Sequence, residues 1–136
     1  MALFAVLLTA LVVDGAMAKS PALALQCQLE AGDQAPLRAG DRGISPPKRT
    51  RYVAPAYPKD TLGHKGTGMW VGEALIDRTG AVTKVWPLRT PSFEPAWPAF
   101  SESIAAAIRQ WKYAPTMVNG VATPVCMVVT VNIDWR

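Results

Sequence analysis

Few residues of this sequence could carry out chemistry: one histidine, two cysteines and ten acidic side chains. His64 lies between Gly63 and Gly66, where a solvated loop histidine is expected rather than the base of a nucleophilic triad. Glu73 and Asp77 fall on one face of a predicted strand, but their spacing corresponds to about 13 Å, too wide for the carboxylate pair of a glycosidase. The sequence therefore predicts a protein that is not an enzyme.

The two cysteines, Cys27 and Cys126, are candidates for a disulfide that would join the amino-terminal segment to the last predicted strand. In an exported protein such a pair is usually oxidised, and two unpaired thiols are the alternative. Two thiols and a single histidine do not supply the four ligands of a structural zinc site. We therefore expect no metal site and no cofactor.

The chain begins with an apolar run, Ala2–Val13, that is broken only by Thr9 and ends at Asp14. It is shorter than the roughly 20 apolar residues that span a bilayer. Ala16-Met17-Ala18 then supplies the small residues that a signal peptidase reads, so residues 1–18 are predicted to be a cleaved secretory signal peptide. A buried core helix and a fragment of a longer anchor are the alternatives.

The next segment, residues 19–54, is rich in proline and carries no strand or helix pattern, which predicts a linker or a loosely attached arm. It contains the only basic cluster, formed by Lys48, Arg49 and Arg51. A solvated linker is expected there rather than a nucleic-acid site, because short basic runs are common. With 14 Lys and Arg against 10 Asp and Glu, the mildly basic chain favours acidic partners or anionic envelope surfaces.

Regular elements are predicted from there on, within a domain over 55–136. Alternation indicates a strand over Gly68–Ile76 and a second over Ala81–Leu88, where Pro87 restricts the strand to an edge, an end or a bulge. Apolar residues at helical spacing predict one amphipathic helix over Ala99–Tyr113. Val125–Trp135 is the most regular strand of the chain.

A short helix over Lys59–His64 is expected ahead of the first strand. The predicted fold class is therefore α+β, a two-layer sandwich in which the main helix and the short helix pack on one face of a small antiparallel three-stranded sheet. Trp70, Trp111 and Trp135 fall on the predicted core faces, whereas Trp86 and Trp97 lie outside the main periodicity. Exposure of these last two would indicate a binding surface.

Several short motifs follow one another in residues 52–135: Pro55-Ala56-Tyr57-Pro58, then Gly66 and Gly68 opening a strand, Ile76-Asp77-Arg78-Thr79-Gly80-Ala81-Val82 at its turn, Ala107-Ile108-Arg109-Gln110-Trp111-Lys112-Tyr113-Ala114-Pro115, Asn119-Gly120, and a final valine-rich strand. In this order they resemble the TonB C-terminal domain family, energy transducers of outer-membrane transport. Any single motif would be a weak signal, but the combination is quite specific.

The resemblance implies a domain of the periplasm or cell envelope that binds a segment of an outer-membrane transporter or of a periplasmic protein. The segment would be added as a strand beside the last strand, because an edge strand offers unpaired N–H and C=O groups. The partner-binding residues that the resemblance implies are Val125, Cys126, Met127, Val128, Val129, Thr130, Val131, Asn132 and Ile133.

Two alternatives for the function stay open. Transducers of this family usually carry an uncleaved amino-terminal transmembrane helix that engages an inner-membrane motor, so the chain could be such a transducer with a truncated anchor. An envelope structural module that forms a homodimer through its edge strand is the other alternative. Neither the leading interpretation nor these alternatives involve a nucleic acid or a small-molecule cofactor.

Overall fold

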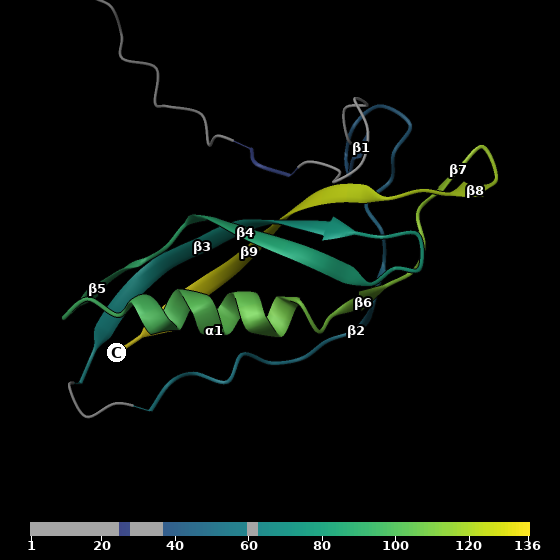
Figure 1. The fold of residues 1–136 in the computed structure, drawn as a ribbon. Coiled ribbons are helices and arrows are strands. Elements are labelled where there is room, and N and C mark those ends of the chain that lie inside the picture. Colours follow the sequence, from purple (N-terminus) through teal and green to yellow (C-terminus); the bar gives the residue numbers. More distant parts are fainter. Residues whose placement is uncertain (1–24, 28–36, 60–62) are drawn as a thin grey trace, which may run out of the picture.

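The computed structural model describes residues 25–27, 37–59 and 63–136, which form an α+β fold with one helix against a five-stranded sheet (Figure 1). The coarse α+β prediction is confirmed, and the sheet has five strands instead of three. The predicted signal peptide and the core of the predicted short helix, residues 60–62, lie outside the described residues. The elements are β1 Leu37–Arg38, β2 Arg49–Arg51, β3 Lys65–Ile76, β4 Val82–Arg89, β5 Ser92–Glu94, α1 Pro98–Ile108, β6 Lys112–Tyr113, β7 Met117–Val118, β8 Val121–Ala122 and β9 Val125–Trp135.

The sheet is built on the long strand β3, which pairs antiparallel with β9 along one side and with β4 and then β5 along the other. The β3–β9 register runs from Gly66 opposite Trp135 to Ile76 opposite Val125 without a shift. β1 adds a short parallel pairing to the outer side of β9. The strand order is β1-β9-β3-β4, so β4 lies at an edge, the kind of position that Pro87 requires.

The β3–β4 hairpin closes at a turn that Asp77 stabilises. One carboxylate oxygen of Asp77 accepts hydrogen bonds from the Thr79 N–H at 2.8 Å, the Thr79 hydroxyl at 2.6 Å and the Ala81 N–H at 3.0 Å. Partial burial raises the pKa of Asp77, but these hydrogen bonds and the nearby Lys112 outweigh that effect, so the net pKa is lowered. Gly80 completes the turn with φ of +86°.

The main core lies between the sheet and α1. Trp70 of β3 is fully buried in this core, and its indole N–H donates to the Ser101 hydroxyl on the helix at 2.9 Å. From the helix, the buried residues are Phe100, Ile104, Ala105, Ala107 and Ile108. These positions are the apolar stripe that the helical spacing predicts.

The helix is shorter than predicted: it ends at Ile108, whereas the periodicity extends to Tyr113. Tertiary hydrogen bonds explain the difference. The Trp111 indole N–H donates to the Val53 carbonyl at 2.8 Å, and the Tyr113 N–H donates to the Gly80 carbonyl at 2.9 Å. Residues 112–113 therefore leave the helix and pair with β2 as strand β6.

Residues 37–54, the longer of the two described parts of the predicted arm, pack on the domain. Leu37, Ala39, Ile44 and Val53 are partly buried against the main core, and β2 pairs with β6. The Arg49 guanidinium lies 4.5 Å from the centre of the Trp111 ring and 4.8 Å from that of Tyr52. Isolated apolar residues between prolines show no periodicity, so the sequence alone did not reveal this packing.

Candidate functional site

The candidate site is the outer edge of β9, and one hydrogen bond fixes the direction of its backbone groups. The Ala39 N–H, just after β1, donates to the Cys126 carbonyl at 2.9 Å, so the polar groups of Cys126 point away from β3. Along a strand, the N–H and C=O of one residue point to the same side and those of the next residue point to the other. Because the β3–β9 register has no shift, the backbone of every second residue from Cys126 onward faces outward.

Four residues therefore present outward N–H and C=O groups beyond Cys126, namely Val128, Thr130, Asn132 and Asp134. Within the described residues, β9 pairs only with β3 and, at its first two residues, with β1, so these four positions have no strand partner. The outward groups follow one another about 6.7 Å apart, the spacing of a β ladder. These four positions form the unpaired stretch of β9, which we call the open edge.

The open edge divides the nine predicted binding residues into three groups. Val128, Thr130 and Asn132 have outward backbone groups with no strand partner in the part of the chain that the structure describes, whereas Cys126 is covered by β1. Asp134 belongs to the open edge but was not in the predicted set. The remaining five turn their backbone toward β3, and they are Val125, Met127, Val129, Val131 and Ile133.

Side chains on the two faces of the open edge differ in character. Val128 is 47% exposed on the face away from the helix, and Thr130 and Asn132 are exposed beside it. On the helix face, Val129 and Ile133 are buried, while Val131 and Met127 are only partly buried against the core. A strand added here would meet apolar side chains on the helix face and a mixed surface on the other.

The closed end of the edge is secured by a disulfide. Cys27 and Cys126 are bonded, with 6.0 Å between their Cα atoms, which agrees with the predicted disulfide. Each cysteine is only 1% exposed, and Leu75 and Trp86 pack against them. The disulfide joins the segment 25–27 to the same residue that pairs with β1.

A buried carboxylate, Glu73, reinforces this end. It is fully buried and accepts hydrogen bonds from the backbone N–H groups of Gln26 and Cys27, the latter at 2.7 Å. It also forms an ion pair with Arg38 of β1, whose guanidinium reaches the Cys27 carbonyl at 3.4 Å. Glu73, Arg38 and the disulfide therefore hold two amino-terminal segments against the start of β9.

Sequence reasoning found the disulfide but missed the part played by Glu73 and Arg38. Glu73 alternates with Met69, Val71 and Leu75 on one strand face, and a carboxylate among apolar neighbours is a signal of burial with partners. The partners themselves come from a segment without periodicity, so only the structure identifies them.

An aromatic cluster at the far end of β9 surrounds Trp97. Its indole stacks on the His64 ring with centroids 4.5 Å apart and 4° between the planes, and it also contacts Phe100 and Trp135. The prediction of a solvated loop histidine is wrong, because His64 is 6% exposed and its Nδ1 lies 2.5 Å from the Pro95 carbonyl oxygen. The Trp97 indole covers one face of the His64 ring, and this contact explains the burial of His64.

Tyr57 joins the same cluster from the segment ahead of β3. Its ring stacks on Phe100 with centroids 4.7 Å apart and meets Trp135 edge-on. Burial and, secondarily, the nearby Tyr52 raise the pKa of the Tyr57 hydroxyl. Trp97 and Trp86 are both partly buried in clusters, so neither indole offers a freely exposed platform.

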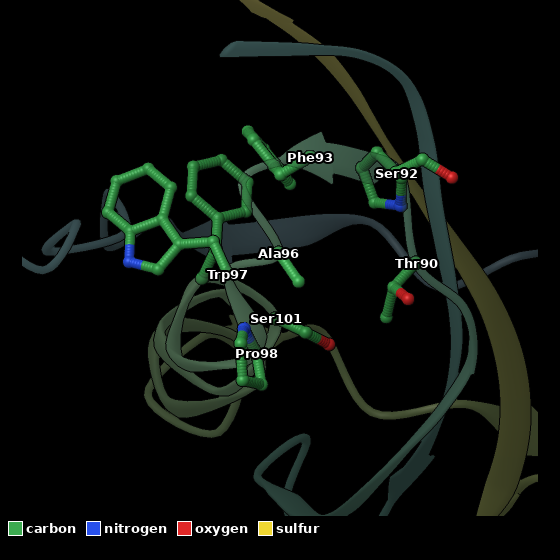
Figure 2. A pocket seen from close by; sticks show the side chains of 9 residues that line it. Thr90, Ser92, Phe93, Ala96, Trp97, Pro98 and Ser101 are labelled. Carbon is green, nitrogen blue, oxygen red and sulfur yellow. The ribbon is translucent and has the colours of Figure 1, made fainter. Parts of the chain in front are cut away.

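A pocket of about 460 Å³ lies between the segment 90–93 and the first turn of α1 (Figure 2). Among the described residues that line it none is charged, and its walls combine aromatic rings and prolines with three hydroxyl groups; they are Thr90, Pro91, Ser92, Phe93, Ala96, Trp97, Pro98, Phe100 and Ser101. Such walls can hold an apolar group but supply no general acid or base.

Two further observations concern the chemistry available to the molecule. Within residues 25–27, 37–59 and 63–136, no three His, Cys, Asp or Glu side chains are grouped as ligands of a metal ion. In the part of the chain that the structure describes, no helix is both long and apolar enough to cross a membrane.

Comparison with known proteins gives no relative of this chain: no protein-family model, no curated protein and no solved structure matches it.

Proposed function

We propose that this chain is an exported, TonB-like domain that binds a segment of a partner protein by adding it as a strand to the open edge of β9. The observation that carries the proposal is the run of outward backbone groups at Val128, Thr130, Asn132 and Asp134, which have no strand partner within the described residues. An unpaired strand edge is a template for an extended peptide, whose main chain completes the ladder.

The opposite edge of the sheet is a poorer template. β4 contains Pro87, which has no N–H to donate, and its pairing with β3 is shifted next to this residue. Ala81, the residue just before β4, already forms a β-bridge to Lys112. The β9 edge has no proline and no register shift over its whole length, so it offers a continuous ladder.

The partner that this proposal implies is an extended segment of an outer-membrane transporter or of a periplasmic protein. Partly buried Met127 and Val131 on the helix face favour a segment with apolar side chains at alternate positions. The proposed location is the periplasm or cell envelope, and the closed Cys27–Cys126 disulfide supports an oxidising compartment. The proposed role is binding rather than catalysis.

A proline substitution tests the proposal selectively. The Thr130 N–H points outward, so Thr130→Pro removes a donor from the open edge without removing a bond to β3. Thr130→Ala is the matched control because it keeps the backbone donor. The probe is a set of synthetic peptides from the amino-terminal segments of outer-membrane transporters of the same organism, with affinity measured by calorimetry.

We expect at least one peptide to bind the wild type, Thr130→Ala to bind it equally, and Thr130→Pro to bind it at least tenfold more weakly. Circular dichroism of Thr130→Pro must match the wild type for the comparison to hold. Equal affinity of both variants would contradict strand addition. Self-association that is sensitive to Thr130→Pro, without peptide binding, would instead identify a dimerisation module.

A further inference from the structure

A small β-hairpin stands outside the main sheet, formed by β7 Met117–Val118 and β8 Val121–Ala122 (Figure 1). Its two-residue turn has φ of 50° at Asn119 and 77° at Gly120, the positive values that tight hairpin turns require. In the ribbon view this hairpin projects beyond the end of the sheet, away from α1 and from the carboxyl terminus. It is therefore accessible to a partner at one end of the molecule.

The projecting hairpin exposes apolar side chains. Met117 is 58% exposed and Val121 is 63% exposed, the highest values among the large apolar side chains of the described residues. Because Val118 pairs with Val121 and Met117 with Ala122, Met117 and Val121 point to opposite faces of the hairpin. No residue over 114–125 is charged. The apolar surface thus surrounds a convex tip and is not a flat patch or a groove.

Cationic residues lie near the base of this hairpin. The Lys48 carbonyl accepts a hydrogen bond from the Ala114 N–H at 2.8 Å, and Lys48 and Met117 line one hollow of about 290 Å³. Arg51 of β2 is opposite Lys112 of β6, and all three of these cationic residues are exposed. This spatial cluster includes Lys112 from a distant part of the chain, so it is larger than the basic run seen in the sequence.

Asp77, a carboxylate that lies close enough to Lys112 to interact with it electrostatically, is already engaged in its own turn. Asp77 accepts three hydrogen bonds within this turn, and these bonds lower its pKa more than the charge of Lys112 does. Among the described residues, Lys48 and Arg51 form no ion pair, and Lys112 shares its charge only with the Asp77 turn, so this side of the hairpin can attract an external anion. Cations near the base of a hairpin that exposes apolar side chains on both faces are complementary to one environment in particular, the anionic surface of a lipid bilayer.

We propose that the β7–β8 hairpin docks this protein on an anionic lipid surface. Met117 and Val121 enter the boundary between the lipid headgroups and the acyl chains. A lipid layer can cover both faces of a projecting hairpin at once, whereas a protein partner would need a groove that encloses the hairpin. Lys48, Arg51 and Lys112 contact the headgroup phosphates. This inference is independent of strand addition, because the hairpin and the open edge of β9 share no residue.

The test measures partition of the full chain onto vesicles of phosphatidylglycerol and phosphatidylcholine in equal parts, by co-sedimentation. Met117→Ser/Val121→Ser should weaken partition about tenfold, because two apolar side chains lose their burial. Lys48→Gln and Lys112→Gln should each weaken it about fivefold. Met69→Ser, which removes an exposed apolar side chain of β3, is the matched control and should leave partition unchanged.

The position of contact is measured separately, so that binding by another part of the chain is recognised. In nanodiscs that contain a nitroxide-labelled phospholipid, the Met117 methyl signal should broaden while amide signals of α1 stay sharp. Equal partition of the hairpin double variant and the wild type, or an unbroadened Met117 signal in the bound state, would overturn the proposal. Equal partition onto pure phosphatidylcholine would also overturn it, because the surface would then not be selected by its charge.

Discussion

The disulfide between Cys27 and Cys126 should contribute a large part of the stability of the fold. The two cysteines are 99 residues apart in the chain, and a loop of that length gives about 4.7 kcal/mol in the chain-entropy model. Opening the bond also releases segment 25–27, whose N–H groups donate to the buried Glu73. Single domains are stable by about 5–15 kcal/mol, so we expect the reduced protein to lie close to the limit of folding.

The assay is guanidinium unfolding of the oxidised wild type, the wild type in a dithiol reductant, and Cys27→Ala/Cys126→Ala. Tryptophan fluorescence reports the transition, since Trp70 and Trp111 are buried in the core. Reduction and double substitution should each lower the free energy of unfolding by about 4–5 kcal/mol. The reductant should have no effect on the double variant, which serves as the control.

A reduced wild type within about 1 kcal/mol of the oxidised protein would refute this reasoning, because that is far below the chain-entropy value. Such a result would mean that Glu73 and the pairing of β1 hold the amino-terminal segments without the covalent bond. It would also remove the disulfide as the element that secures the closed end of the edge.

Three further predictions concern single residues. Glu73→Gln should lower the free energy of unfolding by about 2–3 kcal/mol in urea, because a buried charged network loses its charge, whereas Glu102→Gln, in an exposed ion pair, should change it by less than about 1 kcal/mol. Gly120→Ala, with positive φ but open space, should cost about 1–2 kcal/mol; Gly80→Ala should cost about 1–3 kcal/mol more than that in the same assay, because its new Cβ would also meet a backbone oxygen at 1.8 Å, and equal losses would contradict the argument. The pKa of Asp77 is lowered from 3.8, so its stabilising effect is complete above that pH and is lost as the pH falls below it. Asp77→Asn should therefore be less stable than the wild type at neutral pH, and the difference should vanish in acid; a constant difference across a pH series of melting temperatures would contradict this.

Patterns of local origin were predicted well from the sequence. The bounds of β9 agree with the predicted Val125–Trp135, because strict alternation over a whole strand has no other simple interpretation. The β3–β4 hairpin and its Asp77–Gly80 turn follow from residue types that the turn requires. The disulfide was predicted from the number of cysteines and the expected compartment, and the two cysteines are bonded.

Features that depend on distant partners could not be predicted. The helix stops at Ile108 because Trp111 and Tyr113 find hydrogen-bond partners elsewhere in the chain, and periodicity carries no information about them. In the same way, His64 is buried because Trp97 stacks on it. Strand β1 comprises only two residues, too few for any pattern, yet it covers Cys126 and so determines where the open edge begins.

The central claim, that a partner adds as a strand to the open edge of β9, is tested most directly by residue-resolved amide hydrogen exchange with and without a transporter peptide. In the free protein, the amides of Val128, Thr130 and Asn132 should exchange much faster than those of Val129 and Val131, which face β3. The account predicts that the peptide protects the first group and leaves the second unchanged. Protection elsewhere, with the three outward amides still exchanging freely in the bound protein, would contradict it.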